Sequence, residues 1–449
     1  MDAYAPYLLD HPNEGKIVAV AEPNPARREA FAKKFDVPPE CQFRTHEEVF
    51  AREKFADFVI VATGDRQHLE PAVAAMERGY DVLLEKPMAV TEDGCRKLDE
   101  VASRTGRLLQ VCHVLRYAPF FERLKEIVDS GEIGKVVAIQ HAENVAYWHY
   151  AHSYVRGLYR NSATSSPMIL AKSCHDLDLL YWLAGNSEPV EVVSQSIPTT
   201  LAERNTPPGA PSYCVDGCPH ASTCPYDAVD AYLRVGPPMR DLEMTRRVRW
   251  AGFVRWVVRT ARKRPWLLKL LTLGRAKKLV PWRGWPVSQV TDDLTDDGIL
   301  KALGETPWGR CAYGVGKDAA WEGNDQVAAQ TVSIKFSNGV LANFTMHGYS
   351  YREGREIRID GTRGTARGEF YNVEQVLRVF DHKTGRERVE KLPLVLDAHG
   401  GGDKRLFAGF LAALRGEAEP LTSVRQSLWS HLMAFAAEEA AKTGRAVRF

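Results

Sequence analysis

Lys86 stands directly after an apolar run at 80–84, between Glu85 and Pro87. A lysine at the end of a core strand is unusual, because its ammonium must be solvated or paired. Its position makes Lys86 a candidate catalytic residue, and the alternative is a surface turn in which Pro87 ends the strand.

His175 is a second candidate, within a helical pattern at about 174–184. Lys172 and Asp178 lie three residues on either side of it, and side chains at this spacing share one helix face. Imidazole titrates near neutral pH and can accept a proton from a hydroxyl group. The alternative is a histidine that only caps the start of the helix.

Aromatic and basic side chains cluster after a later strand. Trp148, His149, His152 and Arg156 are followed closely by Tyr159. Aromatic faces stack on sugar rings, and histidine and arginine bind hydroxyl or carboxylate groups. The cluster predicts a wall of a substrate site, with a packed edge of the domain as the alternative.

Three cysteines form the pattern Cys214-x3-Cys218-x5-Cys224, and Cys311 could return to them. Four thiolates satisfy tetrahedral zinc, and a loop-rich segment gains stability from a metal. The alternatives are packed thiols or an iron–sulfur cluster, and His220 is an alternative ligand. The pattern therefore predicts a possible structural zinc site.

Four short apolar runs near the start of the chain alternate with helical patterns. This order is typical of a parallel sheet covered on both faces, which binds ligands at the carboxyl ends of its strands. The runs are 16–21, 57–62, 80–84 and 107–112, and the helical patterns are 25–35, 67–79 and 91–104. The expected carboxyl ends carry Glu22, Thr63, Asp65, Glu85 and Lys86.

From about residue 135 strand patterns follow one another without helices between them, as in a mixed or antiparallel sheet. These runs are 135–141, 191–196, 328–336, 339–346 and 355–360, and a last helical stretch covers about 422–443. Residues 197–322 are predicted to be an insertion. A basic stretch in it, 246–264, predicts an amphipathic helix packed on its own domain or on a membrane surface.

The composition excludes several classes of protein. The chain has 449 residues, 45% hydrophobic and 26% charged, with 59 Lys and Arg against 57 Asp and Glu. These values exclude a mainly disordered chain, and a net charge of +2 argues against nucleic acid as a partner. No signal peptide pattern or apolar run of membrane-spanning length is visible, so we expect a cytoplasmic protein with reduced cysteines.

Several motifs together resemble the Gfo/Idh/MocA family of NAD(P)-dependent oxidoreductases. The family reads Ala-Thr-Pro-Asp-x-x-His and then Glu-Lys-Pro, and this chain has Ala62 to His68, with Gly64 in place of Pro, and Glu85-Lys86-Pro87. The further matching blocks are His113–Tyr117, Ser130–Gly134, Trp148–Gly157, Lys172–Asp178 and His399–Asp403.

The resemblance implies an α/β plus α+β fold. Residues 1–118 would form a Rossmann-like dinucleotide-binding domain. Residues 119–449 would form a substrate and oligomerisation domain, with a mixed or antiparallel open sheet, helices on one face, and the insertion at about 197–322. The exposed face of such sheets implies a homo-oligomer, a dimer or tetramer.

The resemblance also implies hydride transfer between nicotinamide and a carbohydrate, cyclitol or sugar acid. It implies that Lys86 lies at the nicotinamide, where its charge stabilises an oxygen that becomes anionic and burial lowers its pKa enough for proton transfer. The implied cofactor-binding residues are Glu22, Thr63, Asp65, His68, Glu85, Lys86 and Arg116. The implied substrate residues are Trp148, His149, His152, Arg156 and Asp178. A carboxylate at Glu22 would favour NAD over NADP, although Arg27 and Arg28 nearby keep NADP possible.

One departure from the family leaves the proton acceptor open. The family often has Asp four residues before the histidine, where this chain has Ala171 followed by Lys172. The acceptor could therefore be Lys86, Lys172 or His175. An NAD-dependent glycoside hydrolase acting by transient oxidation, and a non-catalytic sugar sensor, are the alternative functions on the same scaffold.

The first strand and the Gly-x-Gly-x-x-Gly loop of a dinucleotide fold are not recognisable before the run at 16–21. That strand is central in the sheet, so the runs at 16–21 and 57–62 should each lack a neighbour on one side. The glycine loop normally holds the pyrophosphate. We therefore expect that the chain as written comes from an N-terminally truncated reading of the gene. Alone, this chain should bind NAD poorly.

Overall fold

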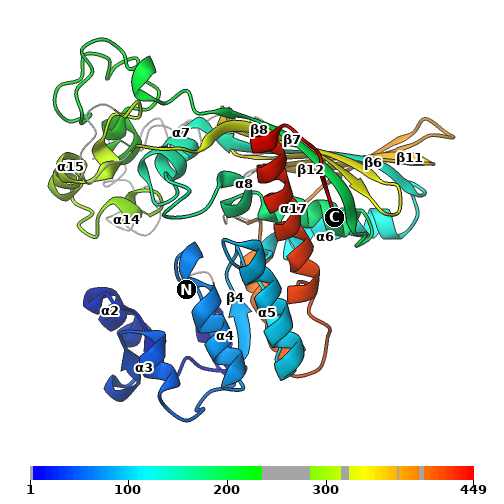
Figure 1. Ribbon diagram of the computed structural model, residues 1–449, viewed down its shortest axis with the longest axis horizontal. Coiled ribbons are helices and arrows are strands. Elements are labelled where there is room, and N and C mark those ends of the chain that lie inside the picture. The colour runs from blue at the N-terminus through cyan, green and yellow to red at the C-terminus, as the bar shows by residue number, and fades with distance from the viewer. Residues whose placement is uncertain (1–3, 235–283, 315–322, 372–373, 394–398) are drawn as a thin grey trace.

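The structure is a computed structural model that describes residues 4–234, 284–314, 323–371, 374–393 and 399–449. A small domain with parallel strands lies beneath a broad sheet, and the described residues of 200–234 and 284–310 extend to one side (Figure 1). Among the described residues, no helix combines the length and the apolar character needed to cross a membrane.

The first domain has the predicted alternation of strands and helices. Its main sheet is parallel and has the order β3-β4-β5, with Val61 beside Leu84 and Leu84 beside Val111. The strands are β1 (Val20–Ala21), β2 (Gln42–Phe43), β3 (Phe58–Val61), β4 (Asp81–Leu84) and β5 (Leu109–Val111). The helices are α1 (Tyr7–Asp10), α2 (Pro25–Phe35), α3 (His46–Phe50), α4 (Leu69–Glu77) and α5 (Glu92–Thr105).

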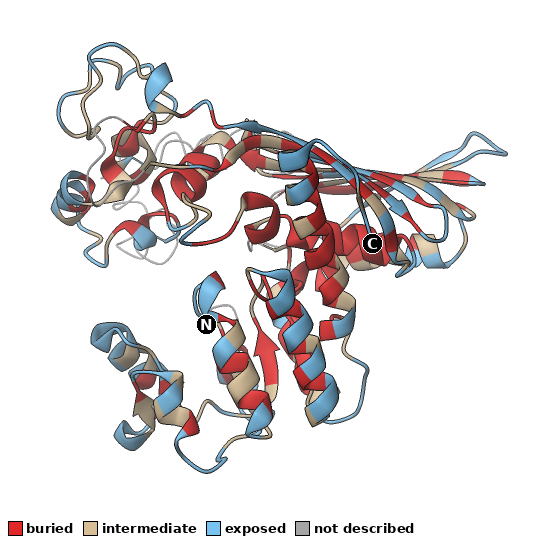
Figure 2. Cartoon of the chain, in the orientation of Figure 1, coloured by how far each residue is buried: buried red, intermediate tan, exposed pale blue. Residues whose placement is uncertain are grey.

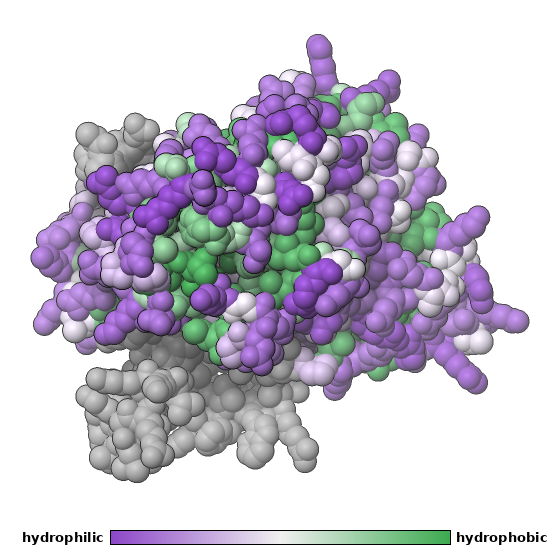
Figure 3. All heavy atoms as spheres, turned by 90° about the horizontal axis from the view of Figure 1, so that it is seen from below, coloured by the Kyte–Doolittle hydropathy of each residue, from purple (hydrophilic) through white to green (hydrophobic). Residues whose placement is uncertain are grey.

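The sheet of this domain is divided. Among the described residues β1 pairs only with β2, and β3 pairs only with β4. In the described residues, therefore, no strand joins β1 to β3, as expected from the sequence. Phe58, Val59 and Ile60 are only half-buried. From below, hydrophobic residues gather in the middle of the molecule's face and hydrophilic ones surround them (Figure 3).

The second domain contains a nine-stranded mixed sheet in which only β6 and β9 are parallel. Its strands in sheet order are β13 (Glu387–Lys391), β12 (Glu374–Asp381), β11 (Gly364–Tyr371), β10 (Gly354–Gly361), β6 (Val136–Ala146), β9 (Leu341–Ser350), β8 (Val327–Phe336), β7 (Pro189–Pro198) and β14 (Val447–Arg448). Residues alternate between buried and exposed along β8 and β9, which leaves one face of the sheet open (Figure 2).

Helices cover the other face of the sheet. The helices are α6 (Pro119–Asp129), α9 (Cys174–Leu183) and α17 (Val424–Thr443), and their apolar side chains share one core with the strands. Phe120 and Phe121 of α6, for example, pack against Phe370 of β11. The helices on one face agree with the fold class expected from the sequence.

The end of the chain also builds the first domain. Phe407 and Phe410 of α16 (Gly402–Leu414) pack beside Tyr4 and Leu83 in a core of that domain. Leu428 of α17 is buried against the α4–α5 core, while other α17 residues belong to the second domain. Helix α17 therefore contributes to the cores of both domains, although its residues lie within the range 119–449 expected for the second domain.

The segment at 197–322 has a small apolar core of its own. Tyr232 and Val287 are buried there with Ile299 and Leu303 of α15 (Asp296–Glu305). The basic stretch at 246–264 lies outside the described residues.

Candidate active site

Lys86 lies in the loop after β4 and points its ammonium towards the second domain. Its Nζ donates a hydrogen bond to the carbonyl oxygen of Ala171 at 2.8 Å. Burial by itself lowers the pKa of Lys86, but Tyr159, Cys174, Glu85 and Asp65 raise it above its ordinary value. The lowered lysine pKa expected from the sequence is therefore wrong for this structure: Lys86 remains a cation.

His175 lies near the start of α9 and is 5% exposed. Its ring is 5.6 Å from that of His113 and 6.1 Å from that of His399, centroid to centroid. Burial and the charge of Lys86 lower the pKa of His175 well below its ordinary value, so it does not titrate near neutral pH as expected. Its Nδ1 is buried and has no hydrogen-bond partner among the described residues.

Lys172 joins a buried group of charges beside His175. Its Nζ is 3.2 Å from Glu353 Oε1 and 3.4 Å from Glu143 Oε1. Burial alone lowers the pKa of Lys172, and the two carboxylates raise it above its ordinary value. A protonated lysine held by two acidic groups is a poor proton acceptor, which leaves His175 as the better-placed base.

Arg355 extends this group along the sheet. It lies opposite Glu143 in the β10–β6 pair, and its NH2 is 2.6 Å from Glu143 Oε2. Its Nε donates to Asp176 Oδ1 at 2.7 Å, and His141 Nε2 lies 2.7 Å from the same oxygen.

Sequence reasoning missed Glu143, Glu353 and Arg355. Glu143 and Arg355 occupy the phase of β6 and β10 that otherwise holds buried apolar residues such as Ile139 and Ile357. A charged residue in the buried phase of a strand was the signal that could have identified them.

The predicted cofactor residues lie at the carboxyl ends of β1, β3 and β4. Glu22 is half-exposed and Thr63 is exposed. Glu22 accepts a hydrogen bond from the backbone amide of Asn24 at 2.8 Å, and Arg28 NH1 donates to the carbonyl oxygen of Glu22. Glu85 accepts a hydrogen bond from the Tyr4 hydroxyl at 2.7 Å. Glu22 and Thr63 thus remain open to a ligand at this edge.

Asp65 and His68 fix loops rather than face solvent. Asp65 Oδ2 accepts a hydrogen bond from Ser166 Oγ at 2.6 Å. His68 is 1% exposed and lies between two carbonyl oxygens, 2.6 Å from that of Pro87 and 3.1 Å from that of Thr63. Both side chains therefore position the segments around the cofactor edge.

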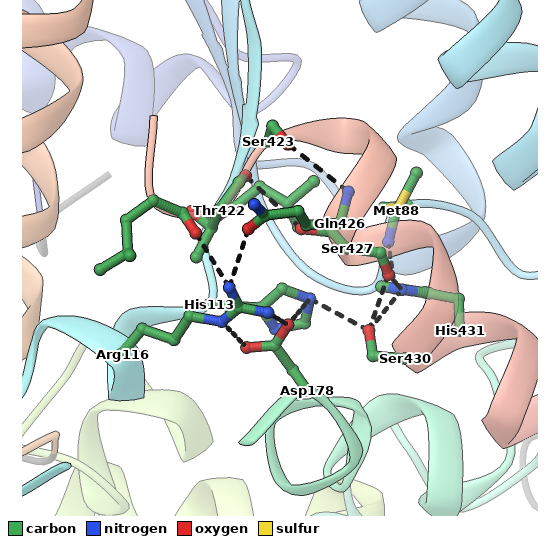
Figure 4. Close-up of polar contacts among 12 residues, drawn as sticks. Met88, His113, Arg116, Asp178, Thr422, Ser423, Gln426, Ser427, Ser430 and His431 are labelled. Carbon is green, nitrogen blue, oxygen red and sulfur yellow. Dashed lines mark hydrogen bonds and ion pairs between the residues drawn. The ribbon is translucent and has the colours of Figure 1, made fainter. Parts of the chain in front are cut away.

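Arg116 and Asp178, predicted to bind cofactor and substrate, pair with one another. Both are 0% exposed, and Arg116 Nε and NH2 donate to the two Asp178 oxygens at 2.7 and 2.6 Å. Arg116 NH1 also donates to the Leu421 carbonyl and to Gln426 (Figure 4). The two charged groups therefore satisfy one another away from solvent.

The predicted substrate wall divides into two parts. His149 Nδ1 is 3.0 Å from Glu353 Oε1, and the Trp148 indole nitrogen has no partner among the described residues. These two side chains lie beside the Lys172 group. His152 instead bonds Tyr232 and Gln289, and the Arg156 guanidinium donates to two main-chain carbonyls. His152 and Arg156 therefore contact the insertion rather than the Lys172 group.

The four cysteines do meet. Cys214, Cys218, Cys224 and Cys311 line one pocket together with His220. Burial raises the pKa of the Cys214, Cys224 and Cys311 thiols. No group of three or more His, Cys, Asp or Glu in the described part of the chain could hold a metal ion. The structure therefore does not support the zinc prediction.

Comparison with known families gives matches along most of the chain. A model of the oxidoreductase family with an NAD-binding Rossmann fold matches residues 1–113. Models of the C-terminal domains of the same family match 121–213 and 307–449. The chain belongs to the Gfo/Idh/MocA oxidoreductase family. Residues 214–306, between the matched ranges, fall within the predicted insertion.

Individual relatives in this family agree. Inositol 2-dehydrogenase 2 of Saccharopolyspora erythraea is 34% identical over 131 residues, which is 29% of this chain and 35% of the relative. Inositol 2-dehydrogenase of Salmonella paratyphi B is 29% identical over 169 residues, 37% of this chain and 46% of the relative. The matched segments thus span less than half of these proteins.

Solved structures show the same fold. An oxidoreductase domain protein from Kribbella flavida superposes with a TM-score of 0.66 at 15% identity, covering 99% of this chain and 95% of that one.

Proposed function

We propose that this protein is an NAD(P)-dependent oxidoreductase that oxidises a CH–OH group of a cyclitol or sugar. The observation that carries the proposal is the convergence of a cationic Lys86, a neutral His175 and the Lys172–Glu353–His149 group between the two domains. The inositol dehydrogenases among the relatives support a polyhydroxy substrate. They give no support to the glycoside-hydrolase alternative.

Each of these residues would have a separate task. Bound NAD would supply the hydride acceptor, with its nicotinamide beside Lys86 and its adenosine ribose at Glu22. The Lys86 ammonium would stabilise negative charge on the reacting oxygen, and His175 Nδ1 would accept the hydroxyl proton. His149 and Trp148 would bind further hydroxyl groups. The carbon then loses a hydride and its hydroxyl loses a proton, which gives a carbonyl group.

Glu22 supports NAD over NADP, since its carboxylate would repel a 2′-phosphate. Arg28 donates to the Glu22 main-chain oxygen and not to its carboxylate, so this charge remains available to ribose hydroxyls. All eight cysteines are free, which is consistent with a cytoplasmic location.

The test is NADH formation during incubation with NAD and a panel of cyclitols, sugars and sugar acids. A dehydrogenase accumulates one NADH per product, whereas a glycoside hydrolase of this type regenerates its cofactor. Wild-type protein that binds NAD and a panel member but forms no NADH would contradict the proposal.

A further inference from the structure

Helix α17 reaches the loop that carries Lys86. His431 of α17 accepts a hydrogen bond at Nε2 from the backbone amide of Met88, at 2.8 Å. The two residues are 343 positions apart, and His431 is 0% exposed (Figure 4). Because α17 belongs to the cores of both domains, it is a rigid support for this contact.

The surroundings of His431 fix which ring nitrogen carries the proton. Its Nδ1 is 2.9 Å from the carbonyl oxygen of Ser427, which can only accept, so the proton sits on Nδ1. Nε2 then has a free lone pair for the Met88 amide. Burial lowers the pKa of His431 to about 3, and the neighbouring His113 ring and Lys86 ammonium act in the same direction. The ring therefore stays neutral and in one tautomer at neutral pH.

The same loop is held from its other side. His68 donates from Nδ1 to the carbonyl oxygen of Pro87 at 2.6 Å. The Lys86 Nζ is itself fixed on the Ala171 carbonyl. The carbonyl oxygen of Pro87 and the amide of Met88 are thus each bound by a buried histidine from a different element. These contacts fix the direction in which the Lys86 side chain leaves the sheet.

We propose that His431 is a positioning residue for the reaction, which holds the Lys86 ammonium in place through the Met88 amide. This inference rests on the proposed function, because it gives Lys86 its task. Without the acceptor at Nε2, the Met88 amide would be buried and unpaired, and the loop would move to satisfy it. A displacement of about 1 Å at a reacting group can cost ~10²-fold in rate.

The first test compares His431→Leu with His431→Gln. Glutamine places an amide oxygen near the position of Nε2 and can accept the Met88 amide, whereas leucine cannot. We expect His431→Leu to lower kcat by ~10²-fold with a much smaller change in KM, and His431→Gln to recover most of the loss. Met433→Ala is the matched control, since Met433 is equally buried on α17 but belongs to the core of the second domain.

The outcome that would overturn the inference is a kcat of His431→Leu equal to that of Met433→Ala. A kcat of His431→Gln as low as that of His431→Leu would do so as well. Assays run well below the melting temperature of each variant keep a simple loss of stability from imitating the effect.

A second readout does not need activity. Acetic anhydride labelling, followed by mass spectrometry, reports the exposure of Lys86 relative to the surface residue Lys97. We expect faster Lys86 labelling in His431→Leu than in wild type, and wild-type labelling in His431→Gln. Equal labelling in all three proteins overturns the inference. If the labelling result holds but wild type forms no NADH, the proposed function fails and the positioning of Lys86 stands.

Discussion

Lys86 is a half-buried cation whose charge is set by its neighbours. The groups around it hold its pKa above the ordinary value in spite of desolvation. A lysine that stays protonated can stabilise negative charge but is a poor base. Burial and the Lys86 charge lower the pKa of His175, which keeps its ring neutral at neutral pH. The pKa shifts of Lys86 and His175 thus distinguish a cation from a neutral ring, whereas the sequence alone left both residues as possible proton acceptors.

The first prediction concerns that charge. Lys86→Ala should lower turnover by at least ~10²-fold, because the developing oxygen anion loses its counter-charge. Circular dichroism and steady-state NADH formation measure fold and turnover. Lys97→Ala, on an exposed helix face, is the matched control and should keep wild-type turnover. Near-normal turnover in Lys86→Ala would remove this lysine from the mechanism.

The second prediction concerns Glu143, which is buried beside Lys172 and Arg355. Burial raises its pKa from 4.5 to about 7, although Arg355 and Lys172 oppose the shift. A carboxyl group with a raised folded-state pKa stabilises the folded protein at low pH. That contribution is lost as the pH rises through the folded-state pKa. The free energy of unfolding of wild type should therefore fall, relative to Glu143→Gln, between pH 4.5 and about 7.

Urea unfolding at several pH values measures this difference. Glu369→Gln, on the open face of the same sheet, should keep the wild-type pH dependence. Parallel curves for wild type and Glu143→Gln would show that this carboxyl does not titrate in the window.

At the scale of elements, α17 and the segment at Arg116 join the two domains. The Arg116–Asp178 pair links η3 (Val114–Tyr117) to α9, and Arg116 also binds the chain just before α17. Ser430 of α17 lies 3.3 Å from His113, which precedes η3. These buried contacts place the Lys86 loop, the His175 helix and α17 in a fixed relation.

The third prediction follows from this pair. Asp178→Asn should lower the free energy of unfolding by about 3–5 kcal/mol, because it leaves the buried Arg116 charge without its counter-charge. Urea unfolding measures the loss. The surface pair Arg123–Glu390 is the comparison: Arg123→Met should cost no more than ~1 kcal/mol. Similar costs for the two variants would mean that the Arg116–Asp178 pair contributes little.

The elements that the sequence predicted are those with a local pattern. The apolar runs at β3, β4 and β5 and the helices α2 and α5 lie close to their expected bounds. Helix α16 and strands β11 to β13 were missed. The docking of α16 and α17 on the first domain could not be predicted from the sequence either, because it joins residues about 300 positions apart.

The site shows the same limit. Lys86, Lys172 and His175 were found from residue type and spacing. Glu143 and Arg355 meet only through the register of two strands more than 200 residues apart, and His431 meets Met88 only through helix docking. Conversely, Arg116, Asp178, His152 and Arg156 carry reactive groups, and the structure buries each of them against specific partners.

At the scale of the whole molecule, no helix among the described residues covers one face of the broad sheet. Val193 and Ile197 of β7 and Leu341 of β9 lie on that face and are 44%, 57% and 53% exposed. Apolar side chains spread over a flat sheet are typical of an interface between subunits. We therefore propose that two copies of the chain pair through this face.

The fourth prediction tests that pairing. In a two-fold interface each substitution occurs on both subunits, so Val193→Glu with Leu341→Glu would bring four carboxylates into one apolar contact. We expect wild type to be a dimer or tetramer by size-exclusion chromatography with light scattering, and the double variant to be a monomer with unchanged circular dichroism. Leu300→Glu is the control, because Leu300 is 39% exposed on α15, away from the sheet, and its variant should keep the wild-type mass. A double variant that keeps the wild-type mass would show that the open face does not join the subunits.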